Sequence, residues 1–185
     1  YQYILLFTKE RTTKLFMILQ CKSCLLLCVW IEAELLEKIG ETHQGLFDMA
    51  FFRIVPNLTI MAPKDFKELE DMMTFAVNLK APVVIRYPRG GEAERKFRSH
   101  SYIYLKRAET LTIGKDVTIV AIGNQVSKAM EVCIRLKKYG ISAEVINARF
   151  IKPFDKYAII NSIFKTRFVV TIEDGTLVRR ASYNN

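Results

Sequence analysis

The segment from Gly40 to Gly90 constrains the fold most, because its sequence alternates between helical and strand patterns. Turn residues separate four expected elements, which are a short helix over Leu46–Val55, a strand over Leu58–Met61, a longer helix over Asp65–Leu79 and a strand over Val83–Ile85. This alternation is typical of an α/β unit with a parallel sheet, whose ligands bind beyond the carboxyl ends of the strands. We therefore expect a ligand site in the loops at that edge.

The longer helix has the clearest local signals. Asp65 is the expected N-cap, and Glu68 stands three residues later as its capping-box partner. Apolar residues then recur at helical spacing, at Phe66, Leu69, Met72, Met73, Phe75 and Ala76. This face predicts a helix that packs on the sheet.

A second α/β unit is expected after a charged linker that contains Gly90 and Gly91. Its expected elements are strands over Val117–Ala121, Ala143–Ile146 and Phe168–Ile172, and helices over Ser127–Tyr139, with Gly140 as C-cap, and Asp155–Ile163. Gly123 and Asn124 form the expected turn before the first helix. Because only three strands precede the end of the sequence, this unit is interpreted as truncated.

The totals restrict the class of protein. The chain has 185 residues, of which 50% are hydrophobic, so it has room for one or two domains with an apolar core. The formal net charge is +9, but the basic residues are scattered, which favours small phosphates over nucleic acid or a membrane surface as partners. No apolar stretch reaches the length of a membrane span. We therefore expect a cytoplasmic protein.

Three of the four cysteines are clustered at Cys21, Cys24 and Cys28. The cluster lacks a convincing fourth ligand, so we expect reduced thiols and no metal site.

Few side chains in the expected loops carry chemistry. His43 suits proton transfer near neutral pH, although a lone histidine is more often an ordinary surface residue. Arg86 and Arg89 flank a Tyr-Pro pair, and at most one of them faces a given ligand because residues three apart in an extended segment point to opposite faces. That arginine either binds a phosphate or forms a solvated ion pair. Glu173 and Asp174 end a strand, where such pairs more often cap a helix than transfer protons.

Six segments together closely resemble the 1-deoxy-D-xylulose-5-phosphate synthases, thiamine-diphosphate enzymes of the transketolase superfamily. They are Thr42–Asp48, Arg53–Asn57, Ile60–Pro63, Arg86–Gly90, Asn147–Pro153 and Val170–Asp174. The resemblance covers residues 40–178. It implies an α/β fold, with the second half of a pyrimidine-binding domain at residues 40–90, a linker at 91–108 and a partial transketolase C-terminal domain at 109–185.

The resemblance also implies an activity and its participants. Family members condense pyruvate with glyceraldehyde 3-phosphate and release carbon dioxide. The product is a precursor of isoprenoids, thiamine and pyridoxal. The enzymes are homodimers that use thiamine diphosphate and Mg²⁺. His43 matches the histidine that moves protons on the substrate oxygens, and Arg89 matches the arginine that holds the aldehyde's phosphate. The family's cofactor-binding residues have no match in this sequence, so we expect this chain alone not to bind the cofactor and to be inactive.

Residues 1–39 do not carry the family's motifs, and Ile39 stands where the family has an aspartate. Codons can be written for this stretch whose frame, read one base earlier, gives family-like segments, including Asp-Arg-Gly before Gly40. We therefore interpret residues 1–39 as an out-of-frame translation. The alternative is a non-catalytic or partner-completed half of a split transketolase-like enzyme.

Overall fold

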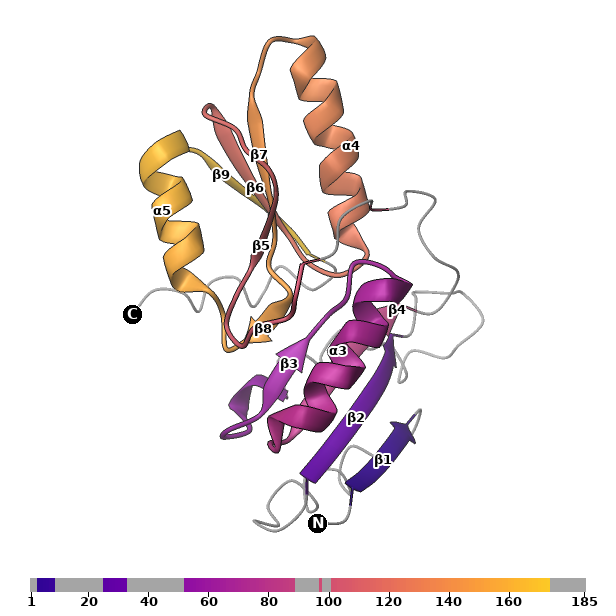
Figure 1. Cartoon of the computed structure of the whole chain (residues 1–185). Coiled ribbons are helices and arrows are strands. Elements are labelled where there is room, and N and C mark those ends of the chain that lie inside the picture. The colour runs from indigo at the N-terminus through magenta and orange to yellow at the C-terminus, as the bar shows by residue number, and fades with distance from the viewer. Residues whose placement is uncertain (1–2, 9–24, 33–51, 89–96, 98–100, 174–185) are drawn as a thin grey trace, which may run out of the picture.

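A computed structural model describes residues 3–8, 25–32, 52–88, 97 and 101–173, which form two sheets with helices beside them (Figure 1). In spatial order, the first sheet contains β1 (Tyr3–Thr8), β2 (Leu25–Glu32), β4 (Val83–Pro88), β3 (Thr59–Met61) and β8 (Phe150–Lys152). The second contains β5 (Glu109–Thr112), β7 (Ala143–Asn147), β6 (Val117–Ala121) and β9 (Val169–Ile172). The helices are α3 (Phe66–Leu79), α4 (Gln125–Lys138) and α5 (Lys156–Thr166). The α/β class expected from the sequence is confirmed.

The centre of the first sheet is a parallel pair of apolar strands, β3 and β4, in the register Thr59↔Val83. All three residues of β3 and the first three of β4 are buried. Because successive strand residues point to opposite faces, burial of consecutive residues means that this part of the sheet is covered on both sides. That explains why both segments are continuously apolar rather than alternating.

Helix α3 begins where its cap predicts. An Asp65 carboxylate oxygen accepts a hydrogen bond from the Glu68 backbone N–H at 2.7 Å. The Glu68 carboxylate accepts from the backbone N–H of Lys64, one residue before the cap, rather than from Asp65 as in the usual capping box. Met72 and Ala76 are buried on the sheet with Met61, Val83, Ile85 and Phe150. The predicted helix and its apolar face are confirmed.

Strands β1 and β2 extend the first sheet from the amino-terminal stretch. Both run parallel to their neighbours, in the registers Tyr3↔Leu25 and Leu27↔Val83. The Leu-rich run at residues 25–27 continues into the strand that pairs with β4. The backbone of this stretch therefore contributes two strands to the first sheet.

The second sheet lies between two helices, with α4 and α5 on opposite faces (Figure 1). Ile119 of β6 packs under α4 with Val126, Ala129 and Val145. On the other face, the hydroxyl of Thr118 contacts that of Thr166 in α5 at 2.8 Å. Each face of β6 therefore packs against a different helix.

Several local predictions for this unit are confirmed, including the turn at Gly123 and the end of α4. Gly140 has a φ of 75°, and its N–H and that of Ile141 donate to carbonyls in the last turn of α4. This is the arrangement that a left-handed residue after a helix provides.

The prediction of a separate three-stranded unit is wrong in two respects. The second sheet has a fourth strand, β5, antiparallel to β7. In addition, β8 leaves this unit and pairs antiparallel with β3 in the first sheet, with Met61 opposite Phe150. Only Ala148 and Arg149 separate β7 from β8, and Arg149 has a φ of 57°, which redirects the chain from one sheet to the other. Both errors concern pairings between segments distant in sequence.

Among the described residues, no helix is both long and apolar enough to cross a membrane.

Candidate functional site

The parallel strands bring two connections to one edge of the first sheet. β3 ends at Met61 and is followed by Ala62, Pro63 and Lys64 before α3 begins, and β4 ends at Pro88, directly before Arg89 in the sequence. Because β3 and β4 are parallel, these connections leave from the same carboxyl edge. This is the edge at which the sequence predicts ligand binding.

One placement made from the sequence is wrong. The segment from Arg86 to Gly90 was expected to be a loop after a strand ending at Ile85, but β4 continues to Pro88. Trp30, Ile31 and Glu32 of β2 pair with Arg86, Tyr87 and Pro88. Pairing with β2 prolongs the strand beyond its apolar run, so Arg86 belongs to the sheet.

Most of the other predicted site residues lie outside the described residues. These are His43, Arg89, Asp174, Cys21 and Cys24, and their roles stay predictions. Glu173 is described and directly follows β9. Cys28 lies in β2.

A group of charged side chains lies where β3 ends and connects the two sheets. We call Lys64, Glu68, Glu109 and Arg149, with Asn147, the interdomain cluster. Lys64 lies just before the N-cap of α3 and Glu68 in the first turn of that helix, while Glu109 begins β5. Asn147 ends β7, and Arg149 lies two residues later. None of the four charged side chains is more than 6% exposed.

Glu68 is the acceptor at the centre of the interdomain cluster. Its Oε1 accepts from Lys64 Nζ at 3.1 Å, Asn147 Nδ2 at 3.0 Å and Arg149 Nε at 2.7 Å. Its Oε2 accepts from the Lys64 backbone N–H at 2.7 Å and from Asn147 Nδ2 at 3.1 Å. A buried carboxylate is tolerated when its oxygens are paired in this way.

Glu109 completes the charge balance of the cluster. Its Oε2 lies 2.8 Å from Lys64 Nζ and 3.0 Å from Arg149 Nη2, and its Oε1 accepts from the Ser101 hydroxyl at 3.0 Å. Burial by itself raises the pKa of Glu109, but the hydrogen bond from Lys64 and the charges of Arg149 and Lys64 outweigh it, so the pKa is lowered. Two cations therefore balance two carboxylates.

Arg149 attaches the end of the linker to the cluster. Its Nη1 donates to the Tyr102 carbonyl at 3.2 Å and its Nη2 to the Ser101 carbonyl at 3.1 Å. The ring of Phe97, the one described residue between Pro88 and Ser101, lies 5.5 Å from Lys64 Nζ. The linker therefore meets the cluster at more than one point.

The interdomain cluster has the features of a structural contact rather than those of a catalytic site. Every carboxylate oxygen of Glu68 and Glu109 already accepts from a partner, so both carboxylates are engaged in buried contacts within the chain. In the described part of the chain, no group of histidine, cysteine and acidic residues has the geometry of a metal site. These residues do not fit thiamine diphosphate or its Mg²⁺.

The interdomain cluster was not predicted from the sequence. Glu68 was interpreted only as a capping partner, and Asn147 and Arg149 only as part of a family motif. The usable signal was the Asn-x-Arg sequence that begins at Asn147, directly after an expected strand, because an arginine buried beside a strand end requires carboxylate partners.

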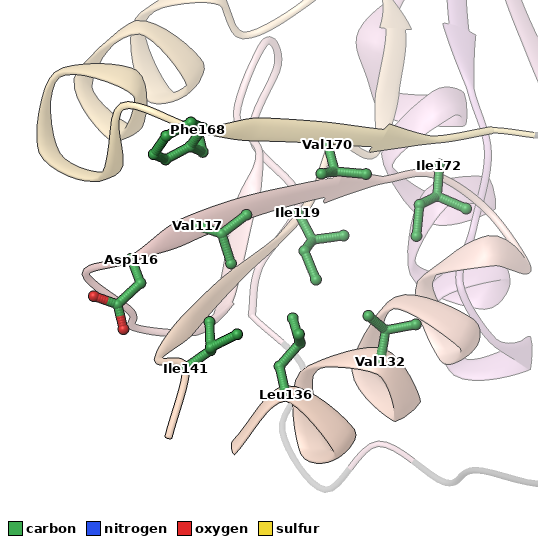
Figure 2. A pocket seen from close by; sticks show the side chains of 9 residues that line it. All are labelled: Asp116, Val117, Ile119, Val132, Leu136, Ile141, Phe168, Val170 and Ile172. Carbon is green, nitrogen blue, oxygen red and sulfur yellow. The ribbon is translucent and has the colours of Figure 1, made fainter. Parts of the chain in front are cut away.

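The described residues also form a hollow in the second unit (Figure 2). It has a volume of about 470 Å³ and lies between α4, β6 and β9, with Leu136 and Val132 facing Ile119 and Val170. Asp116 is its one charged lining residue, and it accepts from the Ser142 backbone N–H at 2.7 Å. The hollow has the apolar surface of a packing face and lacks paired groups for proton transfer.

Two family models match the chain. The transketolase pyrimidine-binding domain matches residues 11–91, and the transketolase C-terminal domain matches residues 106–178. The first match begins within the stretch set apart in the sequence analysis, and that stretch also supplies β1 and β2. The out-of-frame interpretation of residues 1–39 stays a prediction.

Curated relatives agree on a narrower family. The chain is 49% identical over 139 residues to 1-deoxy-D-xylulose-5-phosphate synthase from Halothermothrix orenii, and 47% identical over 142 residues to that from Desulfotalea psychrophila. Each alignment covers 75% of this chain. The chain spans 22% of the length of each relative.

The chain is also similar to solved structures of transketolases. A chain described as a split gene transketolase in an inactive beta4 tetramer is 28% identical, with a TM-score of 0.82 over 95% of this chain and 58% of its own. A transketolase from Pichia stipitis has a TM-score of 0.66 at 24% identity, over 85% of this chain and 25% of its own, which supports the fold alone. The chain belongs to the thiamine-diphosphate-dependent transketolase-type family, as a homologue of the 1-deoxy-D-xylulose-5-phosphate synthases that carries pyrimidine-binding and C-terminal domains.

Proposed function

We propose that this chain supplies the pyrimidine-binding and C-terminal domains for the synthesis of 1-deoxy-D-xylulose 5-phosphate from pyruvate and glyceraldehyde 3-phosphate. The observation that carries the proposal is the 49% identity to a synthase over 139 residues. The family's thiamine diphosphate supplies the carbanion chemistry when bound. In the proposal, His43 moves protons on the substrate oxygens and Arg89 binds the aldehyde's phosphate, with the metal, homodimer and cytoplasmic location typical of the family.

The position of β4 supports the role of Arg89. The strand ends with Pro88 at the carboxyl edge of the first sheet, and Arg89 is the next residue in the sequence. A guanidinium at that edge suits a phosphate because its N–H groups match the phosphate oxygens in pairs. Arg86 lies within the paired strand and is the natural comparison.

We also propose that the 185-residue chain is inactive on its own. Glu68 and Glu109, the buried carboxylates at this edge, are both engaged in the interdomain cluster. In this proposal the group that activates the aminopyrimidine, and the groups that hold the diphosphate and Mg²⁺, are supplied by the rest of the synthase.

A complementation assay tests the proposal. The chain is mixed with the remaining part of the Halothermothrix orenii synthase as a separate polypeptide, and product formation is measured with thiamine diphosphate, Mg²⁺, pyruvate and glyceraldehyde 3-phosphate. We expect turnover that His43→Ala abolishes. Arg89→Ala raises the KM for the aldehyde and leaves that for pyruvate unchanged, and Arg86→Ala is the matched control. Turnover that survives His43→Ala, or equal effects of both arginine variants, contradicts the assignment.

A second candidate is that the chain is one half of a split enzyme. It is supported by the TM-score of 0.82 to a chain described as a split gene transketolase. Affinity purification of the tagged chain from its own cells tests this candidate. A companion polypeptide that restores thiamine-dependent turnover supports it, and recovery of the chain within one longer polypeptide contradicts it.

A further inference from the structure

The described residues join the two sheets by three kinds of contact. β8 pairs with β3, and the backbone N–H of Ala62 donates to the Arg149 carbonyl at 3.0 Å. The Lys152 ammonium donates to the carbonyls of Arg53 and Val55. The third contact is the interdomain cluster, which is the one made by opposite charges closed to solvent.

Arg149 takes part in more of these contacts than any other member of the cluster. Its carbonyl binds Ala62 of the first unit, and its backbone N–H donates to Asn147 Oδ1 at 3.2 Å in the second. Its guanidinium reaches Glu68, Glu109 and the linker carbonyls of Ser101 and Tyr102. One side chain thus connects the start of α3, the start of β5 and the end of the linker.

The charge balance explains why this connection acts as a unit. Removal of the Arg149 charge leaves Glu68 and Glu109 buried with Lys64 alone, and one negative charge is then uncompensated. A buried unpaired carboxylate is relieved by taking up a proton or by admitting water, and water reaches this one where the two units meet. The backbone of Arg149 is also in the left-handed region, at a φ of 57°, a conformation that persists when surrounding contacts hold it.

We propose that Arg149 couples the two units, so that docking of the second unit and fixing of the linker end at Ser101 and Tyr102 occur together. With Arg149 in place, the two units and the linker end open in one event. Without it, the linker end and the contact at Ala62 open while each sheet keeps its own core. This is a conformational device in the fold and does not depend on the proposed reaction.

Hydrogen–deuterium exchange on the 185-residue chain tests the proposal. In Arg149→Met, we expect the amides of Ala62 and of residues 101–108 to exchange at least about tenfold faster, while those of α3 and β6 change less than about twofold. The matched control is Glu144→Gln, which removes an ion pair to Lys165 inside the second unit. It should accelerate exchange in β6 and α5 and leave Ala62 unchanged.

Two results overturn the proposal. One is unchanged exchange at Ala62 and residues 101–108 in Arg149→Met, and the other is equal acceleration of all amides, which means that the two units still open together. If Arg149→Met does not fold, Glu68→Gln is measured instead, because it removes a charge but keeps the shape. It should accelerate the same amides by roughly threefold or more, with the same two contrary outcomes.

Discussion

The interdomain cluster and the core beneath α4 are both closed to solvent, but they are built from different chemistry. Four charged side chains and one amide fill the cluster, whereas Ile119, Val126, Ala129 and Val145 fill the core. In the core, the stabilisation from dispersion and apolar burial is spread over many contacts, so neighbouring side chains partly compensate for the loss of a single contact. In the cluster each charge depends on its opposites, so the loss of one leaves another without compensation. The difference predicts an order of mutational effects.

The largest expected effect is that of Arg149→Met. The variant leaves a buried negative charge, and removing one partner of a buried pair costs about 3–5 kcal/mol, which here weakens the docking of the two units while each core keeps its own stability. Urea unfolding followed by circular dichroism measures the loss. We also expect the single transition to separate into two, because the units are no longer coupled. A loss below about 1 kcal/mol, the size of a surface pair, contradicts the contrast with the apolar core.

The matched change in the core is Ile119→Ala. Ile119 is 2% exposed, and truncation of a buried isoleucine costs roughly 2–5 kcal/mol through lost burial and the cavity left behind. We expect about 3 kcal/mol, seen as a lower midpoint of the one shared transition, because Arg149 still couples the two units. If Ile119→Ala instead splits the transition in two, as Arg149→Met is expected to do, the core and the cluster are not distinct in the way proposed.

The pH dependence of stability is a smaller effect and identifies the cluster by its sign. The pKa of Glu109 is lowered in the folded chain, because the hydrogen bond from Lys64 and the charge of Arg149 outweigh burial. The folded state therefore binds fewer protons, and this contribution is complete above the ordinary glutamate pKa of about 4.3 and is lost as the pH falls below it. Urea midpoints between pH 7 and 3 test this. Glu109→Gln should show a shallower acid loss than the unmodified chain.

The smallest expected effect is local to α3. Asp65→Ala removes the cap on the Glu68 backbone N–H, which costs about 1 kcal/mol. The control is Lys67→Ala, which removes exposed pairs with Glu70 and Asp71 on the same helix and should not shift the urea midpoint. Equal midpoints for the two variants would show that the cap contributes nothing.

The elements that could be predicted from the sequence are those determined by interactions between residues close together in the chain. α3, with its Asp65 cap, and α4, with Gly140 after it, were predictable because cap, apolar face and stop signal lie within a few turns of one another. The strands β6 and β7 were predictable because they are short apolar runs bounded by turns.

What could not be predicted depends on segments far apart in sequence. β8 is three residues long and exists because β3 offers it a pairing edge. The left-handed backbone of Arg149 has no local signal, since arginine rarely adopts it and the contacts that hold it come from Glu68, Ala62 and Ser101. The candidate site residues His43 and Arg89 came from their residue types in expected loops, and their roles from the family resemblance, neither of which gives positions in space.

The central claim is that the carboxylates at the carboxyl edge serve to dock the two units and are not available to a cofactor. Calorimetric titration of the 185-residue chain with thiamine diphosphate and Mg²⁺ tests this most directly. We predict no heat beyond dilution in the micromolar range, because Glu68 and Glu109 already accept from Lys64, Arg149 and their neighbours. Micromolar binding that disappears in Glu68→Gln would contradict the account.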